Sequence, residues 1–222
     1  MENLLIDYGV NNLIGTNFWE SLQKKLNDLD IEKKLYPAGV GDIDFKQSKE
    51  ILKRLNGTVD KKIRDSKILF LGGKNFNDLH SELFNLILDY NQNRCSWNYD
   101  IIGTESMQYG VYSEGGFYNW HRDNYKDSVP FNMKKSLSGN NTIMVNRKIS
   151  VSIFLNDPDE YEGGELDIEF RSPSCKDKRY DTFKLPKGSI VVFPSSSWHR
   201  VRPVTSGVRK SLVAWIFGPP FK

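Results

Sequence analysis

Three residues of this chain have the types and the spacing of a metal centre. His121 and Asp123 lie two residues apart, so on a β-strand their side chains would point to the same face. His199, one of only three histidines, follows an apolar run and a serine-rich turn. Two imidazoles and one carboxylate can hold iron(II) on one face of an octahedron and leave positions open for substrate and oxygen. The sequence therefore predicts an iron(II) site at His121, Asp123 and His199.

An isolated His-x-Asp pair also has a purely structural explanation, because buried histidines often hydrogen-bond to a nearby carboxylate. Arg209, ten residues after His199 (199 + 10 = 209), favours the metal hypothesis. Its guanidinium can bind the far carboxylate of a dicarboxylate cosubstrate through two parallel hydrogen bonds. The alternative is a surface arginine on an edge strand. The neighbouring apolar residues Leu212 and Ala214 favour a packed strand instead.

The remaining candidates for chemistry have simpler explanations. His80 lies among polar neighbours and is expected to be an exposed helix residue. The run Ser195 to Ser197 lacks the elbow motif of a nucleophilic serine and is expected to form a polar turn. The glycines within Glu162 to Glu165 indicate a turn rather than a calcium site. Cys95 and Cys175 have no metal or redox spacing and are expected to be reduced, inert thiols.

The elements that must position these residues change character along the chain. Helical periodicity predicts one helix around residues 18–26 with Asn17 as its N-cap, a short one over 51–55, and a third over 76–90 capped by Asn75. A strand is predicted over 67–71. After about residue 100 the pattern alternates, which predicts strands over 149–155, 166–170, 189–193 and 208–217. Residues 124–146 and 171–181 are expected to form loops over the mouth of the site.

Short alternating strands separated by turns predict a jelly roll or sandwich. The predicted fold class is α+β, in one domain over residues 1–222. Residues 1–100 would be mainly helical support packed on one face, and residues 101–222 the jelly-roll catalytic core. A 38% hydrophobic content is enough for a sizeable core.

Composition also limits the partners. A net charge of +3 with dispersed lysines does not predict a nucleic-acid surface. Nothing in the sequence resembles a signal peptide or a membrane span, so a cytoplasmic location and no membrane partner are expected.

Several blocks of the sequence resemble the prolyl-4-hydroxylase-like iron(II)/2-oxoglutarate oxygenases. The blocks run from Tyr112 to Asp123, from Arg147 to Asn156, from Glu162 to Leu166, and from His199 through Arg209 to Trp215. In this order they cover about residues 105 to 218. The N-terminal third is similar to a subgroup with bacterial and phage members, through Ile63 to Lys67 and Asn93 to Asp100.

The resemblance implies a double-stranded β-helix with the metal at one open end. It implies Fe(II), 2-oxoglutarate as cosubstrate and O2, and leaves ascorbate open as an accessory reductant. Arg209 and Tyr112 would bind 2-oxoglutarate, and the hydroxyl of Tyr112 can donate to a carboxylate. Tyr118, Arg147 and Trp215 match positions near the peptide substrate, with core packing as the alternative for the aromatic residues. The collagen-type enzymes carry lysine where this chain has Arg209, which puts the substrate in doubt but not the chemistry.

The function expected from the sequence is hydroxylation of a protein or peptide side chain, with prolyl as the favoured target. A small-molecule hydroxylase remains an alternative. A nucleic-acid oxidative demethylase of the same superfamily is disfavoured by the spacing of Arg209 and by the mild charge. The alternative from another class is a non-catalytic metal-binding jelly roll, which the complete set of ligands disfavours.

Overall fold

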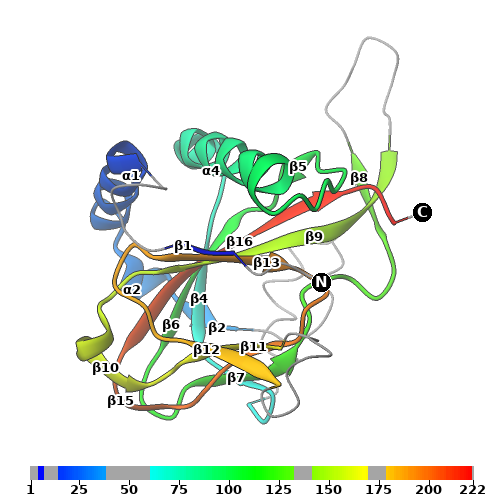
Figure 1. The fold of residues 1–222 in the computed structure, drawn as a ribbon. Coiled ribbons are helices and arrows are strands. Elements are labelled where there is room, and N and C mark those ends of the chain that lie inside the picture. The colour runs from blue at the N-terminus through cyan, green and yellow to red at the C-terminus, as the bar shows by residue number, and fades with distance from the viewer. Residues whose placement is uncertain (1–4, 8–14, 39–60, 133–141, 170–178, 222) are drawn as a thin grey trace.

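The computed structural model describes residues 5–7, 15–38, 61–132, 142–169 and 179–221. In these residues two antiparallel sheets lie one above the other, and helices cover the outer face of the larger sheet (Figure 1). None of the helices described here is long and apolar enough to cross a membrane.

The larger sheet contains nine of the described strands. They are β1 (Leu5–Asp7), β2 (Tyr36–Pro37), β4 (Lys67–Leu71), β5 (Gly103–Thr104), β6 (Met107–Tyr112), β8 (Val129–Asn132), β9 (Thr142–Phe154), β13 (Ile190–Pro194) and β16 (Arg209–Gly218). Their order is β1-β13-β9-β16-β6-β4-β2, with β5 paired to β16 and β8 to β9. The long strands β9 and β16 therefore form the centre of the sheet.

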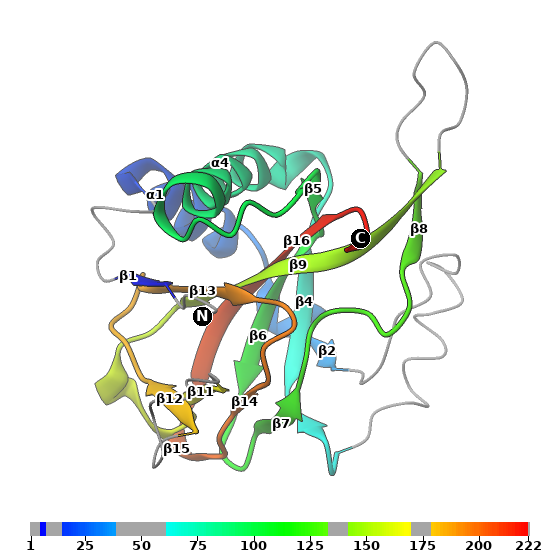
Figure 2. The same ribbon diagram turned by 45° about the vertical axis from the view of Figure 1, so that its right-hand side comes forward.

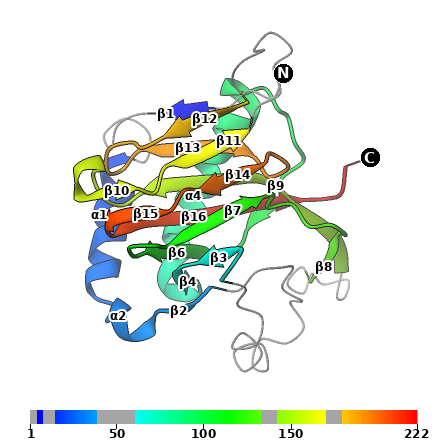
Figure 3. The ribbon, with the colours of Figure 1, turned by 90° about the horizontal axis from the view of Figure 1, so that it is seen from below.

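The smaller sheet carries the residues of the predicted metal site. Its described strands are β3 (Arg64–Asp65), β7 (Phe117–His121), β11 (Leu166–Glu169), β12 (Tyr180–Phe183) and β14 (His199–Val201), in the order β12-β11-β14-β7-β3. Seen from below, these strands lie in front of the larger sheet (Figure 3). At one side of the molecule, β10 (Tyr161–Gly163) pairs with β15 (Val204–Gly207). Two facing antiparallel sheets of this kind are the predicted jelly roll.

Two long helices support the larger sheet from outside. These are α1 (Gly15–Asn27) and α4 (Asn77–Asp89), which lie side by side over β9, β13 and β16 (Figure 2). The shorter helical pieces are α2 (Ile31–Lys34), 3-10 turns at Lys74–Phe76 and Pro158–Glu160, and a π-helical turn at Tyr90–Arg94. Leu79, Leu83 and Ile87 of α4 are fully buried against the sheet. Each such burial stabilises the fold by about 1.5–3 kcal/mol at most.

The alternation along β9 divides the interior into two layers. Ile149, Val151 and Ile153 belong to the core under the helices, whereas Phe154 belongs to the core between the sheets. Ser150 and Ser152 are buried polar residues of the same strand. The strand pattern predicted for residues 149–155 is therefore confirmed, and it leaves polar side chains facing the space between the sheets.

Some predicted elements differ from the structure. Asn17 lies inside α1, which begins at Gly15, and Asn75 lies in a 3-10 turn before α4, so neither is the N-cap. The prediction of a loop over 124–146 was wrong for Val129–Asn132 and for residues 142–146, because β8 pairs antiparallel with the first residues of β9 (Figure 2). Similarly, Tyr180 and Asp181 belong to β12.

Other predictions fall on residues that the structure does not describe. These are the helix over 51–55, the residue Cys175, and residues 133–141 and 170–178 of the two predicted loops.

Candidate metal centre

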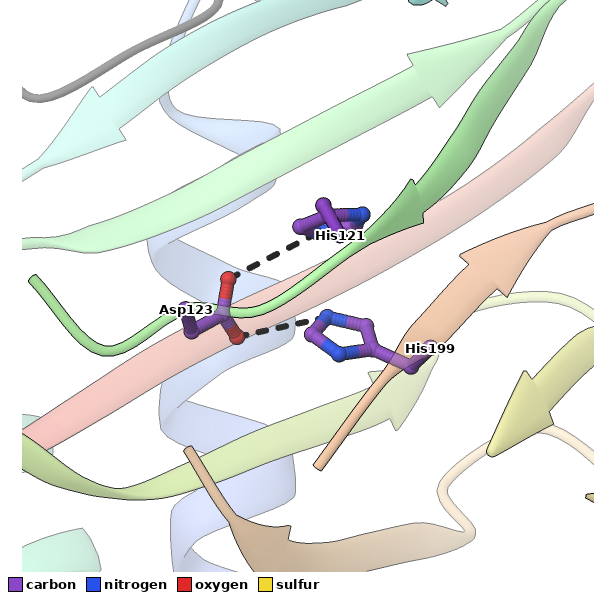
Figure 4. A group of neighbouring side chains, drawn as sticks. All are labelled: His121, Asp123 and His199. Carbon is purple, nitrogen blue, oxygen red and sulfur yellow. Dashed lines mark ion pairs between the residues drawn. The ribbon is translucent and has the colours of Figure 1, made fainter. Parts of the chain in front are cut away.

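The two histidines of the predicted site meet across neighbouring strands. His121 ends β7 and His199 begins β14, and the two residues are register partners. Their rings lie 4.1 Å apart between centroids, and both face the carboxylate of Asp123 (Figure 4). The Nε2 atom of His121 is 3.6 Å from Oδ1 of Asp123, and that of His199 is 3.4 Å from Oδ2. The structure thus brings together the three residues that the sequence selected.

Backbone carbonyls fix the orientation of both imidazoles. Nδ1 of His121 donates to the carbonyl of Asn119 over 2.8 Å, and Nδ1 of His199 donates to the carbonyl of Ser197 over 3.0 Å. Because a carbonyl only accepts, each Nδ1 carries a hydrogen, and in the neutral form of each ring Nε2 offers its lone pair. This arrangement of the outer nitrogen is the usual one for metal-binding histidines.

Burial and charge set the protonation of the three groups. The side chains of His121, Asp123 and His199 are 15%, 8% and 7% exposed. Burial, with His199 nearby, lowers the pKa of His121 to about 4. Burial would raise the pKa of Asp123, but His199 and His121 outweigh it and hold that pKa well below its usual range. For His199, burial lowers the pKa and Asp123 raises it more, so its net pKa is raised.

Asp123 thus offers a negative charge to a cation, and His121 is neutral at neutral pH. Within the described residues, these are the side chains whose ligand atoms lie together as a metal site requires, all within 4.8 Å of one another. Nitrogen and oxygen donors without a thiolate suit Fe(II).

Arg209 is a buried cation in the wall of a pocket that His121, Asp123 and His199 also line. It begins β16, opposite Tyr112 of β6, and only 1% of its surface is exposed. Nη1 donates to Oγ of Ser211 over 3.0 Å, while Nε has no hydrogen-bond partner among the described residues. A buried guanidinium with an unpaired donor is costly unless an anion completes it. The site therefore fits a cosubstrate carboxylate.

The other predicted site residues also line this pocket. Together with the triad and Arg209, the pocket is lined by Tyr112, Tyr118, Arg147 and Trp215. The Tyr118 ring stacks on His121 at 3.5 Å between centroids, and burial raises the pKa of Tyr118 to about 12. Tyr118 therefore remains a neutral phenol beside the predicted metal ligands.

Arg147 pairs with Glu105, a partner that was not predicted from the sequence. Its Nε and Nη2 donate to the two carboxylate oxygens of Glu105 over 2.6 and 2.5 Å, and Nη1 is 3.4 Å from the carbonyl oxygen of Asp123. Its guanidinium also lies 4.0 Å from the centre of the Trp215 ring. Arg147 therefore joins the pocket wall to the backbone at Asp123.

Three further residues of the site were not selected from the sequence. Arg64 is buried in the pocket wall with its guanidinium 4.4 Å from the Tyr118 ring. Ser150 donates to the carboxylate of Asp123, and the carbonyl of Ser195 accepts from the backbone N–H of Asp123, although the serine run that contains Ser195 was expected to be only a polar turn. These contacts join strands far apart in sequence, so no local pattern indicates them.

His80 was expected to be exposed and is instead half-buried. Its Nδ1 is 3.0 Å from Oγ1 of Thr104 and its Nε2 is 3.1 Å from the carbonyl oxygen of Leu71. Both nitrogens thus join α4 to β4 and β5, which gives His80 a structural role. Cys95 is a buried free thiol whose pKa is raised by burial, in agreement with the expectation of an inert cysteine.

Comparison with known proteins relates this site to a single family. The model of the 2OG-Fe(II) oxygenase superfamily matches residues 107–217, half of the chain. A PKHD-type hydroxylase of Aliarcobacter butzleri (strain RM4018) is 41% identical over 113 residues, which cover 49% of this chain and 41% of that protein. Another, from Xylella fastidiosa (strain 9a5c), is 37% identical over 120 residues, covering 52% and 45%. The matched region thus spans less than half the length of these relatives.

Solved structures share the fold over nearly the whole chain. A prolyl-4-hydroxylase of Pseudomonas putida aligns with a TM-score of 0.63 and 19% identity, covering 97% of this chain and 93% of that one. A prolyl hydroxylase of Trichoplax adhaerens, in complex with a hypoxia inducible factor peptide fragment, aligns with a TM-score of 0.64 and 19% identity, covering 98% and 84%. At this identity the likeness concerns the fold, and it confirms the predicted jelly roll.

Proposed function

This chain belongs to the 2OG-Fe(II) oxygenase superfamily, and we propose that it hydroxylates a side chain of a protein or peptide, with proline as the favoured target. The family uses Fe(II), 2-oxoglutarate and O2. When bound, they supply the oxidation: 2-oxoglutarate becomes succinate and carbon dioxide, and one oxygen atom enters a C–H bond of the substrate.

His121, Asp123 and His199 are proposed to hold the metal. The observation that carries this assignment is the convergence of both Nε2 atoms on one buried carboxylate. The same pocket holds a buried arginine whose Nε has no partner among the described residues. Arg209 and the hydroxyl of Tyr112 would bind the distal carboxylate of 2-oxoglutarate. The protein's own contribution is to fix these groups before the reaction and to exclude water from them.

Tyr118, Arg147 and Trp215 are proposed to form the substrate side of the pocket. The rings of Tyr118 and Trp215 make this wall mostly apolar. The guanidinium of Arg147 adds polar atoms whose position is fixed by its pairing with Glu105. Such a wall suits a small ring or aliphatic side chain presented on a peptide. The name of the PKHD-type hydroxylases supports a hydroxylation, and the peptide held by the Trichoplax enzyme supports a peptide substrate.

Two measurements test the proposal. The first is formation of succinate from 2-oxoglutarate, which should require Fe(II) and be lost in each of His121→Ala, Asp123→Ala and His199→Ala. The second is mass spectrometry of a host lysate treated with the enzyme, searching for peptides that gain one oxygen atom. If metabolites in the lysate gain an oxygen atom and peptides do not, the result would instead support a small-molecule hydroxylase.

A further inference from the structure

Two fully buried serines are linked to Asp123: Ser150 contacts its carboxylate, and Ser195 contacts Ser150 and the backbone of Asp123. Ser150 lies in the middle of β9 and Ser195 directly follows β13, and both are 0% exposed. Oγ of Ser150 donates to Oδ2 of Asp123 over 2.7 Å, and Oγ of Ser195 lies 2.9 Å from Oγ of Ser150. The three polar groups therefore form one continuous chain of hydrogen bonds.

The chemistry of the groups fixes the direction of this chain. A serine hydroxyl has one hydrogen to donate, and an ionised carboxylate can only accept. Because an aspartate that binds a metal ion is ionised, the hydrogen of Ser150 points to Oδ2. Ser150 then accepts from Ser195. The order is Ser195 to Ser150 to Asp123, and each donor is aligned by the next acceptor.

Ser195 also holds the main chain of the same aspartate. Its carbonyl accepts hydrogen bonds from the backbone N–H groups of Asp123 and Asn124, both at 3.0 Å, and its own N–H donates to the carbonyl of Lys148 over 2.9 Å. Asp123 lies beyond the end of β7, so strand pairing does not place it. Ser195 thus fixes the backbone of Asp123 and, through Ser150, the side chain.

We propose that Ser150 and Ser195 are positioning residues that orient Asp123 as a metal ligand. The inference rests on the proposed assignment of His121, Asp123 and His199 as the ligands. The hydrogen bond from Ser150 to Oδ2 restricts the rotation of the carboxylate. The carboxylate is thereby held in the orientation in which it can bind the same cation as the two histidines. Partners of this kind behind a ligand typically contribute 10- to 100-fold to metal affinity.

The test is a titration with Mn(II) alone, monitored by the electron paramagnetic resonance signal of free Mn(II). Mn(II) accepts the same nitrogen and oxygen ligands. The variants are Ser150→Ala, Ser150→Thr, Ser195→Ala and His199→Ala, each first shown to be folded by circular dichroism. Ser189→Ala is the matched control, because Ser189 is a buried serine whose hydroxyl has no partner among the described residues and does not line the pocket.

Ser150→Ala should raise the Kd for Mn(II) by about 10-fold or more, and Ser150→Thr should restore it, because threonine keeps the hydroxyl. Ser195→Ala should raise it less, since Ser150 can still donate. Ser189→Ala should leave it unchanged. A purely structural role would lower the melting temperature of the metal-free protein and leave the Kd of the folded protein unaltered.

Each outcome decides between the two hypotheses. If His199→Ala weakens binding and Ser150→Ala does not, the positioning role is wrong and the metal site stands. If His199→Ala binds Mn(II) as the parent does, the ligand assignment itself is wrong. Should Ser150→Ala fail to fold, Ser195→Ala decides, and an unchanged Kd in that variant would overturn the inference.

Discussion

Arg209 lies directly against Gly164, where the side chain of a larger residue would crowd Arg209 and Val204. A Cβ added to Gly164 would come within 3.0 Å of Cδ of Arg209 and 3.2 Å of the Tyr161 ring. Gly164 also has a positive φ of 66°, which disfavours any other residue. The turn after β10 therefore shapes the pocket wall from behind, through the arginine proposed to bind 2-oxoglutarate.

Gly164→Ala should weaken 2-oxoglutarate binding as well as lower stability. Alanine at a left-handed position costs roughly 1–2 kcal/mol, and its methyl group would crowd the side chains of Arg209 and Val204. Gly115→Ala is the control, because Gly115 has a φ of 79° but open space around its Cβ. Both variants should be less stable in urea, and only Gly164→Ala should raise the Kd for 2-oxoglutarate. Equal affinities in the two variants would contradict the coupling.

Replacing Arg209 should weaken cosubstrate binding without weakening metal binding. Arg209→Lys keeps the charge but loses one of two parallel hydrogen bonds. Such a bond is worth about 1.5–3 kcal/mol, hence roughly 10- to 150-fold in 2-oxoglutarate affinity. Arg209→Ala should lose more.

Two calorimetric titrations check this: metal without 2-oxoglutarate, and 2-oxoglutarate with metal. Unchanged 2-oxoglutarate affinity in Arg209→Ala would mean that the carboxylate is bound elsewhere, with Arg64 and Arg147 as the other arginines lining the pocket.

Breaking the ion pair between Glu105 and Arg147 should destabilise the fold. Their side chains are only 11% and 16% exposed, and loss of one partner leaves a largely buried charge. Glu105→Ala should cost about 3 kcal/mol, the low end for such pairs because neither side chain is fully buried. The double variant Glu105→Leu/Arg147→Met should cost less than Glu105→Ala alone. Urea unfolding measures both, and a double variant less stable than the single one would refute the explanation.

Asp167 should make stability depend on pH at the acid end. It is fully buried and accepts from Nε of Arg200 over 2.7 Å and from Nε of Arg202 over 2.8 Å. Burial would raise its pKa, but Arg202, Arg200 and Thr182 outweigh it and lower the pKa. A lowered pKa gives stability that is complete above the unfolded value of about 3.9 and is lost as pH falls through the folded value.

Asp167→Asn should therefore be less stable than the parent at about pH 6 and should approach it at about pH 3. Urea unfolding of the metal-free proteins at both pH values measures the difference. An equal difference at the two pH values would show that the charge of Asp167 contributes nothing to stability.

Local patterns predicted the central strands and the helix above them, but they did not indicate β6, β7 and β14, which carry Tyr112, His121 and His199. The alternation of Ile149, Val151 and Ile153 gave the central strand, and the apolar face from Leu79 to Ile87 gave the helix above it. Strand β8 was missed because Pro130 disfavours a strand. Its only described partner is β9, so Pro130 lies on an edge strand, where the missing N–H costs little.

The groups that contact the proposed ligands could not be predicted in the same way. Ser150 lies 27 residues from Asp123, Ser195 lies 45 residues from Ser150, and Glu105 lies 42 residues from Arg147. A serine or glutamate acquires such a role only when strands distant in sequence are folded together. Histidine, by contrast, occurs only three times in the chain, which made His121 and His199 visible from the sequence alone.

We propose that His121, Asp123 and His199 bind a metal ion, and that 2-oxoglutarate bound at this ion reaches Arg209. The most direct measurement is a crystal structure with Mn(II) and 2-oxoglutarate, with anomalous scattering collected at the manganese edge. The anomalous peak should lie between Nε2 of His121, Nε2 of His199 and the carboxylate of Asp123, with the distal carboxylate of 2-oxoglutarate on Arg209. A fully loaded crystal with the peak at another place, or with 2-oxoglutarate away from Arg209, would contradict the account.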